Sequence, residues 1–303
     1  MPSSPPPSAD GSNANPPVPK PTASLTMLGT GTSAGVPMIG CDCEVCTSSD
    51  PRNRRTRSGV LLDLPDGPRR RHVVIDTAPE LRLQLIRTGV GHVDAALFTH
   101  AHADHIMGLD DLRICSLRAS GALPLYAETP VQTTLQRTFP YAFAEAPRGA
   151  HAGAVPQYEL RTIGLEPFEL FGVAIQPLRL WHGRLPVLGF RIGDTAFCTD
   201  CSRIDDSAWD GLSGVRTLII DALRYAPHPT HFNVEQALAA IERIGPRRAF
   251  LTHLAHEVDH STLLAELPKH VRPAFDGMTI AVDLERPSSE AHGSSDWTAR
   301  DEG

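Results

Sequence analysis

Residues 99–105 read THAHADH, and no other stretch limits so strongly what this chain can fold into. The segment follows the apolar run AALF, so we expect it at the end of a buried strand. Alternate side chains of an extended segment point to one side, which lets His100 and His102 meet one ion. A turn after the strand lets Asp104 and His105 face a neighbouring ion. Imidazole with carboxylate suits Zn, Fe or Mn, whereas a polar loop with incidental histidines would not need all of them in this order.

Composition excludes several classes of protein. The chain has 303 residues, is 41% hydrophobic and carries a formal net charge of −7. This charge argues against a dedicated nucleic-acid binder, and no apolar stretch approaches the roughly 20 residues that span a bilayer. The six cysteines do not resemble the disulfide framework of a small secreted protein. We therefore expect a cytoplasmic location and no membrane partner.

The two ends of the chain differ in composition from its middle. Residues 1–24 are rich in Pro and Ser and have neither the basic nor the apolar region of a secretory signal. Residues 286–303 are similarly polar. Such segments cannot bury a core, so both are predicted to be disordered tails. The predicted folded unit is residues 25–285, as one domain.

Between the tails, apolar runs alternate with helical patterns. A short strand that breaks into a Gly/Thr/Ser loop is predicted within 24–37. Further strands are predicted at 59–64, 72–78, 94–100, 123–128, 171–180, 187–193, 195–200, 215–223, 247–253 and 278–283. Helices are predicted at 79–90, 104–119, 129–139 and 233–245. Blocks of strands with interspersed helices predict an α/β fold with helical layers around packed sheets.

The H-x-H-x-D-H string of residues 100–105 resembles the signature of the metallo-β-lactamase superfamily. The resemblance implies an αββα four-layer sandwich with a two-metal site at its edge. It also implies the remaining ligands, which spacing alone does not locate, and each of them follows a predicted strand. The resemblance implies that His100, His102 and His182 bind one ion. It implies that Asp104, His105 and His253 bind the other ion and that Asp200 bridges the two ions. Asp76 is implied to orient a ligand histidine.

A second cluster of metal-binding residues lies in GCDCEVC, residues 40–46. Cys41, Cys43 and Cys46 have C-x-C-x₂-C spacing, and a structural zinc site requires a fourth ligand. His256 in THLAH is the candidate. The alternative is a set of reduced thiols without metal.

These motifs together resemble a narrower family, the phosphoribosyl cyclic phosphodiesterases of the carbon–phosphorus lyase pathway. The similar segments are LGTGTSAGVPMIGCDCEVC, THAHADH, LTHLAHE and FDGMTI, and they span about residues 25–283. The resemblance implies two divalent ions in the active site, Mn or Zn, and one structural Zn. Residues 140–165 form a loop without a clear counterpart, which leaves the substrate open.

The implied activity is hydrolysis of a small cyclic phosphodiester by a metal-bound hydroxide. The leaving alkoxide needs a proton, and by resemblance His231 is the candidate general acid, with His228 as a competitor. Asp104 is placed with the catalytic residues as well as the ligands. The expected partner is a small-molecule phosphodiester, nucleic acid is not expected, and a homodimer is possible.

Other functions remain open from the sequence. One alternative is an iron oxidoreductase similar to the pyrroloquinoline quinone biosynthesis protein with a comparable cysteine loop. A second is a tRNA 3′-processing endonuclease, which would need a basic surface for RNA. A third is a zinc-stabilised binding protein without catalysis, which would not need the H-x-H-x-D-H string.

Overall fold

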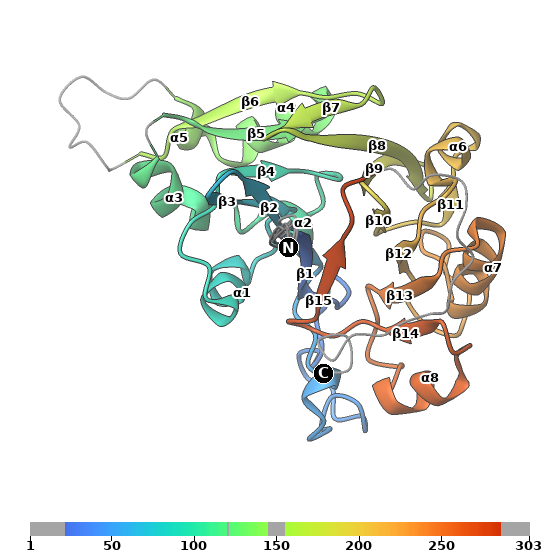
Figure 1. Ribbon diagram of the computed structural model, residues 1–303. Coiled ribbons are helices and arrows are strands. Elements are labelled where there is room, and N and C mark those ends of the chain that lie inside the picture. Colours follow the sequence, from blue (N-terminus) through green and yellow to red (C-terminus); the bar gives the residue numbers. More distant parts are fainter. Residues whose placement is uncertain (1–21, 120, 145–154, 286–303) are drawn as a thin grey trace, which may run out of the picture.

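The computed structural model describes residues 22–119, 121–144 and 155–285. Two sheets lie face to face between two layers of helices, with the first sheet on one side and the second on the other (Figure 1). The predicted αββα sandwich is therefore confirmed. Among the described residues, no helix has both the length and the apolar character needed to cross a bilayer.

The first sheet has seven strands, which belong mainly to the first half of the chain. In spatial order they are β15 (Thr279–Val282), β1 (Ala23–Gly29), β2 (Gly59–Asp66), β3 (Arg69–Ile75), β4 (Ala95–Leu97), β5 (Leu123–Ala127) and β6 (Tyr158–Thr162). Strands β3 to β6 are parallel to one another, whereas β15, β1, β2 and β3 pair antiparallel.

The second sheet is mixed as well. Its strands run in the order β11 (Arg203–Ile204), β8 (Val173–His182), β9 (Leu185–Ile192), β10 (Thr195–Cys198), β12 (Thr217–Asp221), β13 (Arg248–Thr252) and β14 (Val271–Pro273), and β7 (Phe168–Leu170) pairs with β8. Strands β10, β12, β13 and β14 are parallel. All five residues of β12 are buried, as expected for a parallel strand covered on both faces.

Three apolar clusters account for the four layers. One lies between the sheets and includes Leu62, Phe190 and Phe250. Another joins the outer face of the second sheet to α6 (Trp209–Leu212), α7 (Val234–Ile244) and α8 (His260–Glu266). The third joins the first sheet to the helices α1 (Leu81–Thr88), α2 (Ala103–Ile106), α3 (Arg113–Arg118), α4 (Thr129–Thr138) and α5 (Pro140–Phe143).

Helix α7 matches its prediction closely, and the reason is local. Asn233 and Gln236 form a reciprocal capping box, and Gly245 ends the helix in the left-handed conformation. The single helix predicted over 104–119 is wrong, because the segment forms α2, the 3₁₀ turn Leu109–Leu112 and α3. Gly108 interrupts the helix. Its backbone N–H donates to the Thr77 carbonyl, and the Ala78 carbonyl lies so close that a side chain at position 108 would not fit.

Three other predictions need correction. The segment 140–165 is not only a loop, since its described part contains α5 and the edge strand β6. Strands β7, β11 and β14 and helices α6 and α8 were not predicted, because they are too short to show a period. Strand β1 begins at Ala23, two residues inside the predicted tail, because Ala23 pairs with Val282. The rest of both tails, 1–21 and 286–303, lies outside the described residues.

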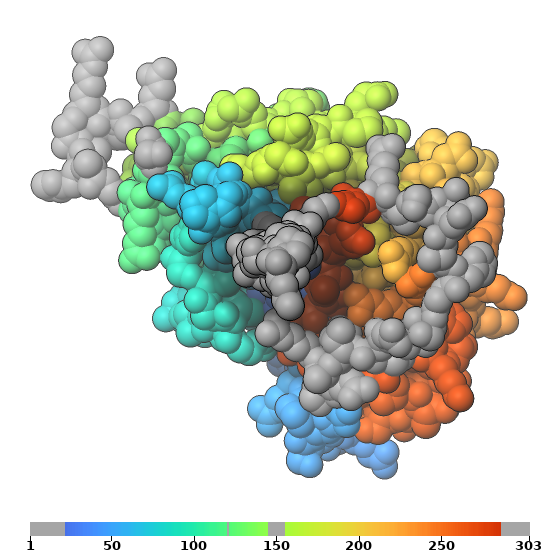
Figure 2. All heavy atoms as spheres, in the orientation of Figure 1, coloured from blue at the N-terminus to red at the C-terminus, as the bar shows by residue number. Residues whose placement is uncertain are grey.

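A segment near the start of the described chain contacts a helix near its end. Residues 30–58, which include the 3₁₀ turn Pro51–Asn53, project from the first sheet and lie against α8 (Figure 2). Asn53 Nδ2 donates to Asp259 Oδ2 at 2.7 Å, and its Oδ1 accepts the His260 backbone N–H at 2.9 Å. This contact brings the cysteine loop next to the segment that follows β13.

Candidate metal centre

The candidate ligands come from strand ends that lie far apart in the sequence. Asp76 follows β3, His100 follows β4, His182 ends β8, Asp200 follows β10 and His253 follows β13. Strands β3 and β4 are parallel in the first sheet, and β10, β12 and β13 are parallel in the second. Within each sheet, the carboxyl ends of these strands therefore lie at the same edge. The structure brings these ends together at one edge of the sandwich (Figure 1).

One group consists of three histidines. A ring nitrogen from each of His100, His102 and His182 lies within 4.8 Å of the other two. The ring centroids are 4.5 Å apart for His100 and His102, and 5.0 Å for His102 and His182. This is the set that the resemblance implied for one ion.

The second group surrounds the Asp200 carboxylate. His105 Nε2 lies 3.1 Å from Asp200 Oδ2 and 3.3 Å from Asp104 Oδ2. His253 Nδ1 lies 3.5 Å from Asp200 Oδ2, while the other oxygen, Oδ1, lies 4.0 Å from His100 Nε2. Asp200 therefore faces both groups, which is the placement that a bridging carboxylate needs.

The free nitrogens of these rings fit a pair of divalent ions. His100 Nε2, His105 Nε2 and His253 Nδ1 are buried and have no hydrogen-bond partner among the described residues. Buried polar atoms are nearly always paired, so three such nitrogens beside one carboxylate fit the ligand set of a divalent cation.

Contacts at the other ring nitrogen fix the orientation of His105 and His182. His105 Nδ1 lies 2.7 Å from Asp76 Oδ2, and His182 Nδ1 lies 2.7 Å from the Thr230 carbonyl. Thr99 donates to Asp76 through its backbone N–H at 2.9 Å and its hydroxyl at 2.8 Å. Such contacts hold the opposite nitrogen toward a metal, and Asp76 makes the contact expected of a residue that orients a ligand histidine.

Burial sets the charge state of the ligands. Burial lowers the pKa of His100, and lowers that of His182 to about 4, so both rings are neutral at neutral pH. Neutral imidazole is the form that binds a metal. Burial opposes ionisation of Asp200, but the neighbouring His253 and His105 outweigh it and lower the pKa of that carboxyl. The centre therefore presents neutral nitrogens at His100 and His182 beside an anionic carboxylate, whereas Asp200 and Asp76 outweigh burial and raise the pKa of His105.

Backbone strain is concentrated at the same residues. Among the described residues, only four other than glycine have positive φ, and three of them are Asp76 (65°), Asp200 (52°) and His253 (61°). This left-handed conformation costs about 1–2 kcal/mol in a non-glycine residue. Strain retained at strand ends that carry candidate ligands is typical of functional sites.

His231, the predicted general acid, lies at the rim of the centre. Its ring centroid is 4.4 Å from that of His182 and 4.8 Å from that of His253. Its Nδ1 lies 2.7 Å from Asp221 Oδ2, at the end of β12, and the same oxygen accepts the Cys201 N–H at 2.7 Å. The competitor His228 is more exposed than His231, and their ring centroids are 5.2 Å apart.

Sequence reasoning missed Asp221. A signal existed, because LIID at 218–221 repeats the pattern of VVID at 73–76, in which an aspartate ends an apolar strand. Burial raises the pKa of Asp221 and lowers that of His231. The contact with Asp221 occupies His231 Nδ1, which leaves Nε2 as the ring nitrogen available to carry a proton for transfer.

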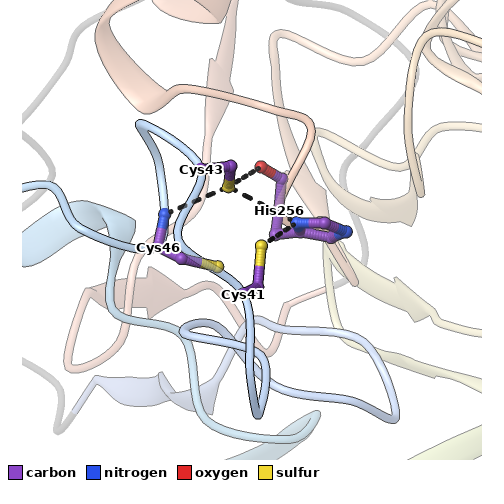
Figure 3. A group of neighbouring side chains, drawn as sticks. All are labelled: Cys41, Cys43, Cys46 and His256. Carbon is purple, nitrogen blue, oxygen red and sulfur yellow. Dashed lines mark hydrogen bonds between the residues drawn. The ribbon is translucent and has the colours of Figure 1, made fainter.

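The predicted cysteine cluster is assembled as well. Cys41, Cys43, Cys46 and His256 have ligand atoms within 4.8 Å of one another (Figure 3). His256 Nδ1 lies 3.3 Å from Cys41 Sγ and 3.5 Å from Cys43 Sγ. Hydrogen bonds from the Cys46 N–H and from His256 lower the pKa of Cys43 to about 6, which favours the thiolate. Three sulfurs and one imidazole nitrogen form a closed set that fits a structural zinc.

A buried arginine holds the backbone on either side of His256. Arg55 donates to the carbonyls of Ala255 at 3.0 Å and Val258 at 2.8 Å. These residues flank His256, which lies three positions after His253. The loop that follows His253, a candidate ligand of the metal centre, is therefore held in place by Arg55.

Comparison with known proteins agrees with this geometry. The β-lactamase superfamily domain matches residues 71–254. A crystal structure described as a new diphosphatase from the PhnP family superposes with a TM-score of 0.78 and 38% identity, over 86% of this chain and 96% of that one.

Two relatives known by name are similar over shorter shares of their length. Octanoyltransferase of Porphyromonas gingivalis is 39% identical over 261 residues, which are 85% of this chain but 51% of the relative. This chain thus spans about half the length of that protein. Coenzyme PQQ synthesis protein B of Methylorubrum populi is 32% identical over 102 residues, 29% of this chain and 33% of the relative.

The domain match covers more than half of the chain, and the PhnP-family diphosphatase matches nearly end to end. Both agree with the sandwich fold and with the cluster of histidines and aspartates at its edge. The chain belongs to the metallo-β-lactamase superfamily.

Proposed function

We propose that this metallohydrolase, similar to the PhnP-family diphosphatase, opens a small cyclic phosphodiester such as phosphoribosyl cyclic phosphate. Two divalent ions, Mn or Zn, held by the residues around Asp200 would supply Lewis acidity to the phosphoryl group and to the attacking water. The structural ion would be Zn at Cys41, Cys43, Cys46 and His256.

The observation that carries the proposal is the Asp221–His231 pair beside the ligands. Opening a cyclic phosphodiester releases an alkoxide, which is a strong base and needs a proton as the P–O bond breaks. His231 Nε2 is the end of the ring opposite the 2.7 Å contact with Asp221, and Asp221 keeps that ring oriented. A diphosphate releases a much weaker base and depends less on such a donor.

Comparing two leaving groups tests this role. Replacing His231 with Ala should slow hydrolysis of a 2′,3′-cyclic nucleotide or of phosphoribosyl cyclic phosphate by about 10²–10⁴-fold. Hydrolysis of bis(4-nitrophenyl) phosphate, whose leaving group is a weak base, should change far less. The metal content, measured by mass spectrometry, should stay that of the wild type. Equal losses on both substrates would exclude proton donation by His231.

A second candidate reaction is hydrolysis of a diphosphate, and the 38% identical PhnP-family diphosphatase favours it. Adding a nucleoside diphosphate to the same panel distinguishes the two. Faster turnover of the diphosphate, with little effect of His231→Ala, would assign the protein to that reaction. The octanoyltransferase relative is about twice as long as the matched segment, so its name supports no proposal for this chain.

The remaining alternatives have their own readouts. Iron in the purified protein without turnover of any phosphoester would support an oxidoreductase similar to the PQQ synthesis protein. Cleavage of a tRNA precursor would support the endonuclease, although a net charge of −7 does not favour RNA binding.

A further inference from the structure

Another group of potential ligands lies at the opposite end of the first sheet. His72 is on β3, and His92 and Asp94 directly precede β4, so these residues flank the amino-terminal ends of strands whose carboxyl ends face the metal centre. One nitrogen of each histidine and one oxygen of Asp94 lie within 4.8 Å of one another. The mechanism proposed above uses none of these residues.

The contacts inside this group resemble those of the metal centre. His92 Nε2 lies 3.3 Å from Asp94 Oδ2, the same separation as between His105 Nε2 and Asp104 Oδ2. Both separations exceed the roughly 2.7–2.9 Å of a charge-assisted hydrogen bond, so an ion could be shared between the nitrogen and the oxygen of each pair. His72 Nδ1 is buried and has no hydrogen-bond partner among the described residues.

The carboxylate is held in place before any ion binds. Asp94 Oδ2 accepts the His72 backbone N–H at 2.8 Å, and Oδ1 accepts from Arg71 Nη1 at 3.0 Å. The rings of His72 and His92 are 4.8 Å apart at an interplanar angle of 65°. Burial lowers the pKa of His72, which keeps this imidazole neutral. Only His92, which is about half exposed, would need to adjust its rotamer.

The surrounding charges are compatible with a cation. Arg70 pairs with Asp63 at 2.7 Å and Arg71 with Asp66 at 2.7 Å, so neither guanidinium is left uncompensated. His92 and Asp94 line a cavity of about 680 Å³, together with Arg70, Arg71 and two further arginines, Arg69 and Arg118. Those two arginines favour water or a small anion at any open coordination position.

We propose that His72, His92 and Asp94 bind one divalent transition-metal ion of the zinc class, with the remaining position open to this cavity. Two imidazoles and one carboxylate select zinc over magnesium or calcium, which prefer oxygen ligands only. The site is separate from the hydrolytic centre and from the cysteine cluster.

Zinc stoichiometry of the full chain tests the proposal. Zinc-loaded protein is dialysed against a zinc buffer and its metal is counted by mass spectrometry. His92→Ala should lose one equivalent per chain relative to the wild type, and His92→Cys, which restores a ligand, should regain it. His270→Ala, at a partly exposed histidine in the turn before β14, is the matched control and should lose none.

The outcomes separate this site from the proposed function. Loss of one zinc in His92→Ala, with unchanged phosphodiester turnover and unchanged melting temperature of the zinc-free protein, supports the site. Equal zinc counts in His92→Ala and the wild type would overturn it, as would a His92→Cys variant that does not recover the lost equivalent. Failure of every phosphoester assay would leave the zinc count interpretable, because the count requires no turnover.

Discussion

Asp76 offers the sharpest test of how the metal centre is built, because one buried carboxylate serves three donors. It accepts the Thr99 N–H at 2.9 Å, the Thr99 hydroxyl at 2.8 Å and His105 Nδ1 at 2.7 Å. Its φ is 65°, a conformation that asparagine tolerates far better than alanine. Replacement by Asn or by Ala therefore perturbs different properties.

Asp76→Ala should destabilise the fold. The Thr99 hydroxyl can turn to His100 Nδ1, which lies 2.9 Å away, so two donors lose their acceptor. Each unsatisfied buried donor costs about 1–3 kcal/mol, and the left-handed backbone adds about 1–2 kcal/mol for alanine. We expect a loss of about 3–8 kcal/mol, measured by urea unfolding of the metal-free protein.

Asp76→Asn should keep most of that stability and instead weaken metal binding. If the amide oxygen accepts the Thr99 N–H, the amide NH₂ faces His105 Nδ1 and forces the ring proton onto Nε2, the nitrogen that faces Asp200. Losing such a contact typically lowers metal affinity about 10–100-fold. Competition with a chromophoric chelator measures it. Wild-type affinity in Asp76→Asn would refute the proposed role of Asp76 in fixing the His105 tautomer.

Three further predictions concern other parts of the fold. Gly108→Ala should destabilise the protein by about 1–3 kcal/mol in urea unfolding, because the added Cβ would lie 2.0 Å from the Ala78 carbonyl; Gly91→Ala, with no atom within 4 Å, is the neutral control. Burial lowers the pKa of His260 to about 4, whereas its pKa in the unfolded chain is about 6.5. Acidification from pH 7 to 5 should therefore lower the free energy of unfolding by about 2 kcal/mol. A His260→Gln variant whose free energy of unfolding falls by the same amount between these pH values would contradict this. Cys43→Ser should remove one zinc equivalent per chain and lower the melting temperature, whereas wild-type zinc content and melting temperature would show that the cysteine cluster holds no structural ion.

Local sequence signals predicted most of the regular elements. Helix α7 was predicted within a residue or two because its capping box and terminal glycine act within a few residues. The segment 104–119 failed because its periodicity continues through Gly108, and only the close approach of the Ala78 carbonyl interrupts the helix. The edge strand β6 was missed because none of its residues is buried, so it has no apolar pattern, and it forms by pairing with β5.

Some residues of the metal centre could also be predicted from local sequence, whereas others could not. The spacing of residues 100–105 indicated metal ligands without any structure, because histidines at alternate positions of a strand end can share an ion. His182, Asp200 and His253 were located only through the family resemblance, since a single histidine or aspartate after a strand has no periodic signal. Asp221 was overlooked because its role depends on a contact with His231, which no local pattern reports.

The sequence by itself determined which side chains are available: an imidazole and carboxylate string, a thiol cluster, and strands that end in aspartate or histidine. Only the tertiary structure decided which of them meet. Residues 41–46 find His256 more than 200 positions later, and Asp200 comes between His100 and His253. The physical reason is that side-chain direction along a strand is set by neighbouring residues, whereas the order of strands in two packed sheets is set by contacts that are distant in the chain.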